Sequence, residues 1–571
     1  MTVSKKDVIR LLETIAVYME LKGENPFKVS AFRKAAAALE VEEQTIDEIE
    51  DFTKLQGIGK GTASVIEEFL QTGQSVVLKE LQEQVPNGLV LLLQLPGLGG
   101  KKIAKLHKEL GIENVDDLRK ACLEKKVRAL AGFGQKTEEK ILAAIASVGN
   151  QPDRLPLAYM LPIAQHLEEE LEKMHDVERF SRAGSIRRVR ETVKDLDFII
   201  STAKPSAVKE QLLKFENIKE IVSAGETKVS LILDYSYDVS VDFRLVKPEE
   251  FATTLHHFTG SKDHNVRMRQ LAKERGEKIS EYGVEVAETG EILTFKSEAD
   301  FYQHFNLPLI PPEMREDGKE IENYSEELNI ISIEDIQGDL HMHSTWSDGA
   351  HSIEQMINEC RKLGYKYMAI TDHSKFLKVA NGLDEERLRR QREEIAKLNE
   401  KYDDITILAG VEMDILPDGS LDFEDDFLEE MDLVIASIHS GFSQTKEQIM
   451  KRLINALNNQ HVDIIAHPTG RKIGIREGYS VDIDFLVELA KETNTALELN
   501  ANPNRLDLSA EHIKKAQEAG VKVVINTDAH RMETLEHMSI GVSTAKKGWI
   551  KRSNVLNALS LDELLQFLHE R

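Results

Sequence analysis

The feature that most constrains the fold is a series of short apolar segments in residues 336–571 that alternate with stretches of helical periodicity. Strands that alternate with helices in this way form a parallel sheet, and this number of repeats predicts a distorted β/α barrel. The expected strands are Tyr367–Thr371, Thr406–Ala409, Leu433–Ser437, Ile464–Ala466, Ala496–Leu499 and Val521–Asn526.

Side chains that can bind a metal lie at nearly every one of these strand ends. The C-terminal ends of the strands of a β/α barrel meet at one mouth, so these side chains are expected to converge. A single histidine at a strand end is more often a core residue, but the repetition from strand to strand predicts a site for Zn, Mn or Fe. The nine candidate ligands are His341, His343, Asp348, His373, Glu412, His439, His467, Asp528 and His530.

Two further residues of this region have candidate roles at the metal site. Arg505 is either a phosphate clamp or a salt-bridge partner, and the residues alone leave both readings open. Asp372 directly precedes His373 and is a candidate to orient a metal ligand from behind.

A second candidate metal site lies earlier in the chain. The apolar run Phe198-Ile199-Ile200 predicts a buried strand, and Asp195 and Asp197 lie two residues apart at its start, so they point to the same face. A later strand-like segment, Val239–Phe243, contains Asp242. Adjacent carboxylates are costly unless a cation neutralises them, and oxygen ligands suit Mg²⁺. Three carboxylates around two metals suit an in-line displacement at phosphorus.

The segment Gly184–Arg188, Gly-Ser-Ile-Arg-Arg, comes just before this strand. Its Gly-Ser turn offers backbone N–H groups and a hydroxyl, and its arginines offer guanidinium forks, all of which suit a triphosphate. A lone Asp-x-Asp is more often a solvated strand edge. Here the Asp-x-Asp pair closely follows the segment Gly184–Arg188, and a later Asp lies between apolar residues. These two features together favour a nucleotide site.

Residues 1–150 are dominated by helical periodicity and repeat a short Gly-x-Gly theme, in Leu55–Gly59, Leu95–Gly99 and Leu130–Gly134. Glycines let the backbone approach a phosphate, and the N-terminus of the following helix presents free N–H groups to it. Three ordinary interhelical turns are the alternative. Lysines after two of the copies favour helix-hairpin-helix motifs that bind the DNA backbone. The candidate DNA-binding residues are Gly57, Gly59, Lys60, Gly97, Gly99, Lys101 and Lys102.

The composition of the 571-residue chain is compatible with these sites and sets limits on its surroundings. The net charge is −26, but residues 1–150 hold 21 Lys and Arg against 22 Asp and Glu, so nearly all of the negative charge lies elsewhere. Two cysteines, Cys122 and Cys360, cannot form a framework and indicate a reducing compartment. The first residues carry charges and no apolar signal core, and the longest apolar run, Leu89–Leu93, is too short to cross a membrane. A soluble intracellular protein is expected.

The Gly-Ser-x-Arg-Arg segment, the Asp-x-Asp strand and the later Asp together resemble the nucleotidyltransferase site of family X DNA polymerases. The resemblance implies that the catalytic residues Asp195, Asp197 and Asp242 hold two Mg²⁺ ions, with Mn²⁺ as an alternative. It further implies that the nucleotide is bound by Arg154, Gly184, Ser185 and Arg188 and, in the thumb, by Phe258, Gly260, Asn265 and Arg269.

Three positions depart from the family's pattern. Val65 occupies the place of the Schiff-base lysine of the family's 5′-deoxyribose-phosphate lyases, and it has no amine for that mechanism. His257 stands where many relatives have Tyr next to the sugar, and Lys194 stands where several eukaryotic relatives have a glycine.

The ordered motifs His-x-His-Ser, Thr-Asp-His, Gly-Val-Glu, Ser-Ile-His, His-Pro and Thr-Asp-Ala-His resemble the PHP (polymerase and histidinol phosphatase) domain. All nine ligand positions are filled, so the resemblance implies an active trinuclear phosphoesterase that holds up to three Mn²⁺ or Zn²⁺ ions.

The expected fold is multidomain, with α+β parts followed by an α/β part. The expected order is a small helical DNA-binding domain (1–80), a fingers-like helix-hairpin-helix domain (81–150), a nucleotidyltransferase palm (151–245), a thumb (246–318), a linker with a short helix (319–335) and the PHP domain (336–571).

Both halves together predict a DNA-directed DNA polymerase that fills short gaps in base excision repair and carries a metal-dependent 3′→5′ exonuclease in its PHP domain. Its partners would be gapped or primed DNA and dNTPs, with no membrane, and it would act as a cytoplasmic, nucleoid-associated monomer. Two alternatives are a PHP site that acts mainly as a 3′-phosphatase or abasic-site endonuclease, and a palm that serves as a non-catalytic DNA clamp.

Overall fold

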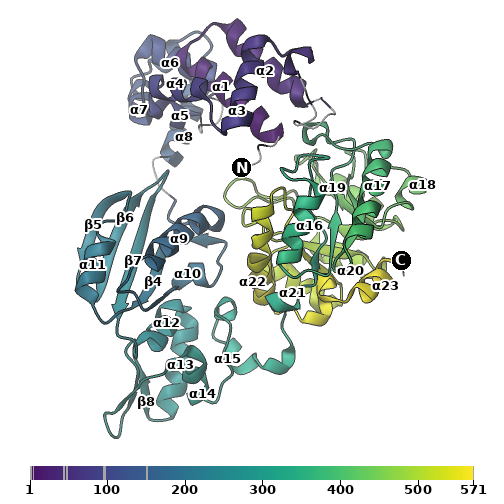
Figure 1. Cartoon of the computed structure of the whole chain (residues 1–571). Coiled ribbons are helices and arrows are strands. Elements are labelled where there is room, and N and C mark those ends of the chain that lie inside the picture. The colour runs from purple at the N-terminus through teal and green to yellow at the C-terminus, as the bar shows by residue number, and fades with distance from the viewer. Residues whose placement is uncertain are drawn as a thin grey trace.

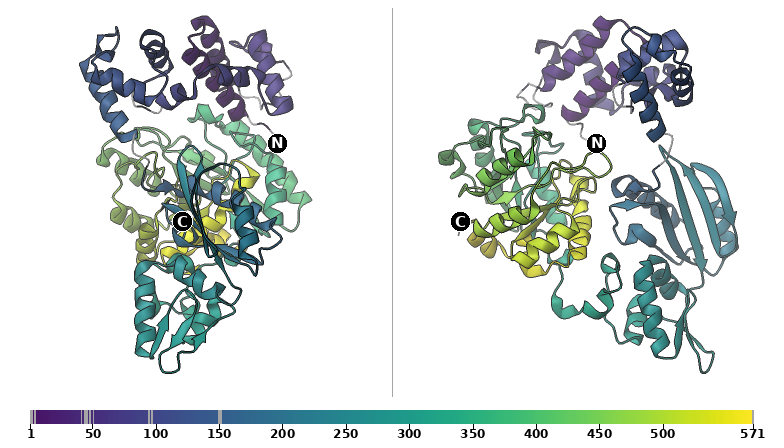
Figure 2. Two further views of the ribbon diagram at one scale, coloured as in Figure 1. Left: turned by 90° about the vertical axis from the view of Figure 1, so that its left-hand side faces the viewer. Right: turned by 180° about the vertical axis from the view of Figure 1, so that it is seen from behind.

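A computed structural model of the chain describes residues 3, 5–40, 42, 46, 49, 51–93, 95, 98–148 and 152–569. Its parts follow one another around a ring (Figures 1 and 2). Helices α1–α8 lie at the top of Figure 1, a five-stranded sheet and a small α/β part follow below them, and a parallel barrel returns alongside to the first helices. In the described residues no helix is long and apolar enough to cross a membrane.

The N-terminal helices form two hydrophobic cores that share one helix. Leu12 and Ile15 of α1 (Lys5–Lys22) lie in the first core with Val65, whereas Leu21 of the same helix lies in the second. Helix α1 therefore joins the two units. The other elements are α2 (Pro26–Glu40), η1 (Phe52–Lys54), α3 (Lys60–Thr72), α4 (Val76–Gln84), α5 (Asn87–Leu92), α6 (Gly100–Leu110), α7 (Val115–Leu123), η2 (Val127–Ala129) and α8 (Gln135–Val148).

The palm is a five-stranded sheet of order β2-β4-β7-β6-β5, in which β4 and β7 run parallel and the other neighbours antiparallel. Its buried face is held by Phe198 and Phe243, whose rings stack with centroids 5.6 Å apart. Figure 1 shows α9 and α10 on the side of the sheet that faces the barrel. The elements are β1 (Leu155–Pro156), α9 (Leu157–Glu172), β2 (Arg179–Arg182), α10 (Gly184–Arg187), β3 (Thr192–Val193), β4 (Asp195–Ser201), α11 (Pro205–Leu212), β5 (Ile218–Ala224), β6 (Lys228–Asp234) and β7 (Asp238–Val246).

The thumb packs three helices against a small antiparallel sheet of order β10-β9-β8. Its elements are α12 (Phe251–Thr259), α13 (Lys262–Glu274), β8 (Glu277–Ile279), β9 (Val284–Val286), β10 (Ile292–Leu293), α14 (Glu298–His304) and η3 (Pro312–Met314). The expected linker contains more than the one short helix predicted, with α15 (Glu320–Asn323), η4 (Glu326–Leu328) and η5 (Ile333–Asp335). Glu320 is buried against His264, with 2.6 Å between its Oε1 and the Nδ1 of the imidazole, so the start of this segment is fixed to the thumb.

The predicted alternation of strands and helices in the last part is confirmed. Seven parallel strands lie in sequence order, and a bridge between Met342 and Ala529 brings the first and last together, so the barrel is nearly closed. The strands are β11 (Gly338–Asp339), β12 (Tyr367–Ile370), β13 (Thr406–Asp414), β14 (Leu433–Ser437), β15 (Ile464–Ile465), β16 (Ala496–Asn500) and β17 (Val523–Asn526). The helices are α16 (Ile353–Lys362), α17 (Glu385–Lys401), α18 (Asp425–Leu428), α19 (Lys446–Leu457), α20 (Ile483–Glu492), α21 (Ala510–Ala519), α22 (Met538–Lys547) and α23 (Leu561–His569).

The barrel and the palm are packed together and not merely tethered. Leu506 of the barrel is fully buried in the hydrophobic core of the palm. Arg471 of the barrel pairs with Glu191 of the palm, with 2.7 Å between its Nη2 and Oε1. Gly474 approaches Pro156 so closely that a Cβ there would lie 2.7 Å from the proline ring.

Candidate metal and nucleotide sites

The palm brings its three candidate carboxylates to one edge of the sheet. Asp197 of β4 lies opposite Asp242 of β7, and Asp195 lies opposite Ser240 in the same register. The expected proximity of these residues is confirmed by this parallel pairing. Asp242 is held in place because Ser230 donates a hydrogen bond to its Oδ1 at 2.6 Å and the Lys228 Nζ lies 2.8 Å from its Oδ2.

The charges of this cluster show why it suits a divalent cation. Burial, followed by the negative charges of Asp195 and Asp242, raises the pKa of Asp197 to about 7. Asp197 therefore resists ionisation unless a cation is bound nearby, and hard oxygen ligands of this kind suit Mg²⁺.

Position 184 requires a glycine for two reasons, its backbone conformation and the closeness of the Asp197 side chain. Gly184 has a φ of +59°, and a Cβ at this position would lie 2.3 Å from the Asp197 Oδ2. The turn is fixed on the strand because the Ala183 N–H donates to the Asp197 carbonyl at 2.8 Å. Ser185 follows in the one-turn helix α10, beside the carboxylate edge.

Arg187 and Arg188 join the palm to the thumb. Arg188 Nη1 donates to the Thr259 carbonyl, and Arg187 donates to the Thr259 hydroxyl at 2.7 Å and to Glu298 at 2.5 Å. Arg154 precedes strand β1 and donates from Nη2 to the Thr192 carbonyl at 2.5 Å. Helix α9 begins three residues later because residues 155–156 pair with β3 instead.

The predicted thumb residues lie around His257. Phe258 carries the Arg244 guanidinium over its ring at 4.3 Å, and Asn265 donates to the His257 carbonyl at 2.7 Å. Arg269 is exposed. Burial lowers the pKa of His257, and the positive charge of Arg269 lowers it further. Gly260 ends α12, where a Cβ would meet the Arg188 guanidinium at 3.1 Å, so the turn borders the arginine of the palm.

The nine candidate ligands of the barrel converge at one end of it. Ligand atoms within 4.8 Å of one another form three groups, which are linked because His343 and His373 each belong to two of them. The His467 Nε2 joins them at 3.1 Å from the Glu412 Oε1. The groups are His343 with Asp348, His373 and His530; His341 with His343 and Asp528; and His373 with Glu412 and His439.

The chemistry of this cluster fits several divalent metal ions. His343 is fully buried, and neither of its ring nitrogens has a hydrogen-bond partner among the described residues. Burial, with the charges of His530 and His373, lowers its pKa to about 3, so its imidazole is neutral, as metal binding requires. Glu412 lies inside β13, which is longer than the predicted Thr406–Ala409 because its far half pairs with β14.

Two buried carboxylates that support the ligands were missed by the sequence analysis. Glu498 of β16 lies 2.6 Å from the His341 Nδ1 and also accepts a hydrogen bond from the His467 N–H at 2.7 Å. Asp414 of β13 lies 3.3 Å from the His439 Nδ1. The only signal in the sequence was an acidic residue inside an apolar run, Ala-Leu-Glu-Leu-Asn.

Asp372 and Arg505 both lie beside the ligands of the barrel. Asp372 accepts hydrogen bonds from Ser344 and Ser347 and from Gln391 at 2.5 Å, so it fixes the loop that follows His343. The Arg505 Nε lies 3.8 Å from the Asp528 Oδ2, as a salt-bridge partner within the metal cluster.

The first two predicted hairpins lie in the N-terminal helices. Gly59 and Gly99 cap α3 and α6, and the exposed Lys60 and Lys101 lie in the first turns of those helices, with Lys102 following. Gly57 has a φ of +111° and approaches the Lys34 carbonyl. Gly97 lies outside the described residues.

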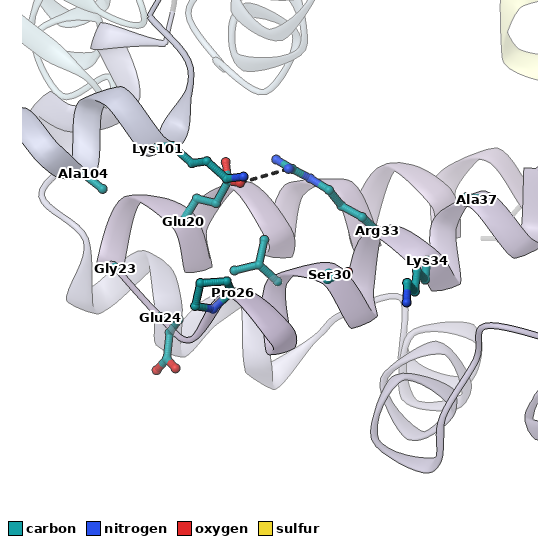
Figure 3. Close-up of a pocket in the computed structure, with 11 residues that line it drawn as sticks. Glu20, Gly23, Glu24, Pro26, Ser30, Arg33, Lys34, Ala37, Lys101 and Ala104 are labelled. Carbon is teal, nitrogen blue, oxygen red and sulfur yellow. Dashed lines mark ion pairs between the residues drawn. The ribbon is translucent and has the colours of Figure 1, made fainter. Parts of the chain in front are cut away.

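A pocket of about 470 Å³ lies between α1, α2 and α6 (Figure 3). Arg33 and Lys101 point into the region of Glu20, and the Arg33 Nη1 lies 2.9 Å from the Glu20 Oε1. The pocket therefore carries positive side chains of α2 together with Lys101 of α6, the helix that begins at the second hairpin.

The two sites define a class of protein: a nucleotidyltransferase with a carboxylate metal site, joined to a barrel with a multinuclear histidine site. Four family models match the chain, namely a helix-hairpin-helix domain over residues 3–75, a SAM-like helix-hairpin-helix tandem over 89–147, the DNA polymerase beta thumb over 254–316 and the PHP domain over 339–502. The chain is 63% identical over 564 residues to the DNA polymerase/3′-5′ exonuclease PolX of Bacillus subtilis (strain 168), which covers 99% of each protein. The chain therefore belongs to the PolX family.

The barrel also has shorter relatives. The chain is 31% identical over 244 residues to a probable phosphatase of Thermoanaerobacter sp. (strain X514), over 41% of this chain and 94% of that protein. A probable phosphatase of Clostridium acetobutylicum is 32% identical over 202 residues, which is 34% of this chain and 78% of the relative.

Proposed function

We propose that the chain is a DNA-directed DNA polymerase that fills short gaps during base excision repair and removes nucleotides from 3′ ends with its barrel site. The observations that support this proposal are a carboxylate cluster at the edge of the palm sheet and a separate histidine-rich cluster in the barrel, both on one chain of the PolX family. One copy of the chain supplies all of the side chains of each cluster, so a monomer is sufficient for both activities.

At the palm, Asp195, Asp197 and Asp242 hold two Mg²⁺ ions, or Mn²⁺ in their place. When bound, the ions activate the primer 3′-hydroxyl and offset charge on the leaving diphosphate. The backbone N–H groups of the Gly184 turn, the Ser185 hydroxyl and the Arg154 and Arg188 guanidinium groups bind the triphosphate.

The thumb closes the nucleotide site from the other side. Phe258 and Gly260 border the sugar, while Asn265 and Arg269 contact the minor-groove edge of the new base pair. Arg188 ties this turn to the palm through the Thr259 carbonyl, so triphosphate binding and sugar placement share one rigid connection. A palm of this kind does not fit a non-catalytic clamp, because three half-buried carboxylates at one sheet edge repel one another unless a cation joins them.

At the barrel, the nine clustered side chains hold up to three Mn²⁺ or Zn²⁺ ions. When bound, such ions would lower the pKa of a coordinated water and stabilise negative charge on the phosphodiester. Glu498 and Asp414 fix the orientation of His341 and His439, and the Arg505 charge lies where it attracts the scissile phosphate.

The N-terminal hairpins hold the DNA through its backbone. Lys60, Lys101 and Lys102 lie in the first turns of α3 and α6, where free N–H groups and positive side chains bind a phosphate without reading sequence. Gapped or primed DNA can therefore be held independently of its sequence.

The test follows a labelled primer on a gapped duplex with Mn²⁺, with and without dNTPs. Asp195→Ala/Asp197→Ala is expected to abolish extension and keep 3′ shortening, and His341→Ala/His343→Ala is expected to do the reverse. Shortening that persists in the histidine variant would overturn the assignment of the exonuclease to the barrel.

A second candidate for the barrel is a phosphatase acting on 3′-phosphates, favoured by its likeness to the probable phosphatases of Thermoanaerobacter and Clostridium. Duplexes that end in a 3′-hydroxyl, a 3′-phosphate or an abasic site separate these activities. Release of inorganic phosphate faster than release of mononucleotides would favour the phosphatase.

A further inference from the structure

Glu316, which follows η3 of the thumb, is surrounded by three cations from two parts of the chain. The Arg190 Nη1 lies 2.8 Å from its Oε2, and the Lys547 Nζ lies 3.3 Å from its Oε1. The Arg188 Nε faces the same Oε1 at a longer distance of 3.9 Å. One carboxylate oxygen is therefore shared between Lys547 at the end of barrel helix α22 and an arginine of the palm.

The surroundings fix this arrangement. The Ser261 hydroxyl donates to the Glu316 carbonyl at 2.5 Å, which ties the residue to the thumb turn that Arg188 also contacts. On the barrel side, the Ser543 hydroxyl of α22 donates to Glu313 at 3.0 Å. Lys547 is thus brought to Glu316 by an interface that includes other contacts along the same helix.

The Arg188 guanidinium is able to bind Glu316 more closely than it does. Its Nε is buried and has no hydrogen-bond partner among the described residues. A buried donor without a partner costs free energy, so Arg188 gains if a carboxylate oxygen comes within hydrogen-bond distance. A direct pair between Arg188 and Glu316 would compete with a triphosphate for the same guanidinium.

We propose that Lys547 of the barrel is a positioning residue for nucleotide binding in the palm: it holds the Glu316 carboxylate and prevents it from closing on Arg188. This inference rests on the proposed role of Arg188 as a triphosphate ligand. Removal of the Lys547 charge leaves Arg188 as the cation that faces the Glu316 Oε1, and the carboxylate moves toward it. The barrel thereby supports polymerisation through one ion pair.

The test measures the apparent dNTP Kd and the maximal rate of single-nucleotide gap filling by the full chain with Mg²⁺. Lys547→Met is expected to raise the dNTP Kd about fivefold, the scale of one partly buried ion pair, with the maximal rate within about twofold of wild type. Lys547→Arg keeps the charge and is expected to keep the wild-type Kd. The 3′ shortening rate is expected to stay unchanged in both.

The decisive variant is Glu316→Gln/Lys547→Met, which removes the competing carboxylate as well. It is expected to return the dNTP Kd to within about twofold of wild type, a rescue that general damage to the interface would not give. The matched control is Lys546→Met, because Lys546 neighbours Lys547 on α22 but faces Glu313 at 3.8 Å, and it should change nothing.

The outcomes separate the inference from the proposed function. If Arg188→Ala raises the dNTP Kd but Lys547→Met does not, the inference is wrong and the proposed function stands. The same holds if the double variant binds dNTP as weakly as Lys547→Met does. If Arg188→Ala leaves the dNTP Kd unchanged, the triphosphate role of Arg188 falls, and the inference falls with it.

Discussion

Glu498 lies directly behind the metal ligand His341, with 2.6 Å between its Oε1 and the His341 Nδ1. Both side chains are fully buried, and Asn526 donates a hydrogen bond to the same oxygen at 3.1 Å. The carboxylate therefore fixes the ring so that His341 Nε2 faces the metal cluster.

Glu498→Gln is expected to weaken metal binding at the barrel by about 10-fold to 100-fold, the usual cost of losing a carboxylate behind a histidine ligand. The exonuclease should lose activity at limiting Mn²⁺ and regain most of it at high Mn²⁺. Metal titration of 3′ shortening measures this, with gap filling in Mg²⁺ as the internal control. If no Mn²⁺ concentration restores the exonuclease activity of Glu498→Gln, the supporting role of Glu498 is contradicted.

Gly184→Ala is expected to reduce gap filling by about 100-fold or more, because the new Cβ would lie 2.3 Å from the Asp197 Oδ2 and displace that carboxylate. The positive φ adds strain of its own. Single-turnover extension measures the effect. Gly225→Ala is a matched control in the turn between β5 and β6 of the same sheet, where the nearest atom to a Cβ is 3.5 Å away and near-normal extension is expected. Normal extension by Gly184→Ala would show that this close approach does not matter.

The sequence predicted those parts of the two sites that depend on local pattern. Asp195 and Asp197 sit on a strand whose apolar run is continuous in the chain, and the barrel ligands recur at strand ends. Glu498 could not be assigned, because a fully buried parallel strand shows no alternation that separates a supporting carboxylate from its neighbours. The contact of Lys547 with Glu316 joins residues 231 positions apart, and no local pattern encodes such a pairing.

Leu506→Ala is expected to destabilise the palm although the residue belongs to the barrel, because its side chain is fully buried in the palm core. Removal of a buried leucine side chain costs about 3 kcal/mol. Two measurements test this destabilisation: the thermal unfolding of the chain, and the loss of gap filling after heating. The exposed Leu363→Ala is the control, since it lies on the barrel surface and should leave both measurements unchanged. Unaltered heat resistance of Leu506→Ala would mean that the two parts are only loosely packed.

The dNTP affinity of the wild-type chain is expected to fall as the pH rises from 7 to 9. Burial, opposed in part by Glu316, lowers the pKa of Lys547 to about 8. The other charged groups that face this side chain are Arg188 and Arg190, with Glu191, Arg471 and Glu511 around the adjoining cavity.

The sign of this dependence follows from the charged form of Lys547. Its hold on Glu316 is present below pH 8 and is lost as the ammonium deprotonates above it, whereas in the unfolded chain the same group keeps its proton to about pH 10.4. The cost of burying the charge disappears over the same range, so the contribution of Lys547 to stability rises between pH 8 and about pH 10.4 while dNTP affinity falls.

Lys547→Arg is the matched control for this dependence, because a guanidinium keeps its proton at pH 9. The ratio of the dNTP Kd at pH 9 to that at pH 7 should be several-fold larger in wild type than in Lys547→Arg, measured on the same gapped duplex. Equal ratios would mean that the ionisation of Lys547 does not reach the nucleotide site. A larger ratio in wild type would trace the pH dependence of dNTP binding to a side chain of the barrel.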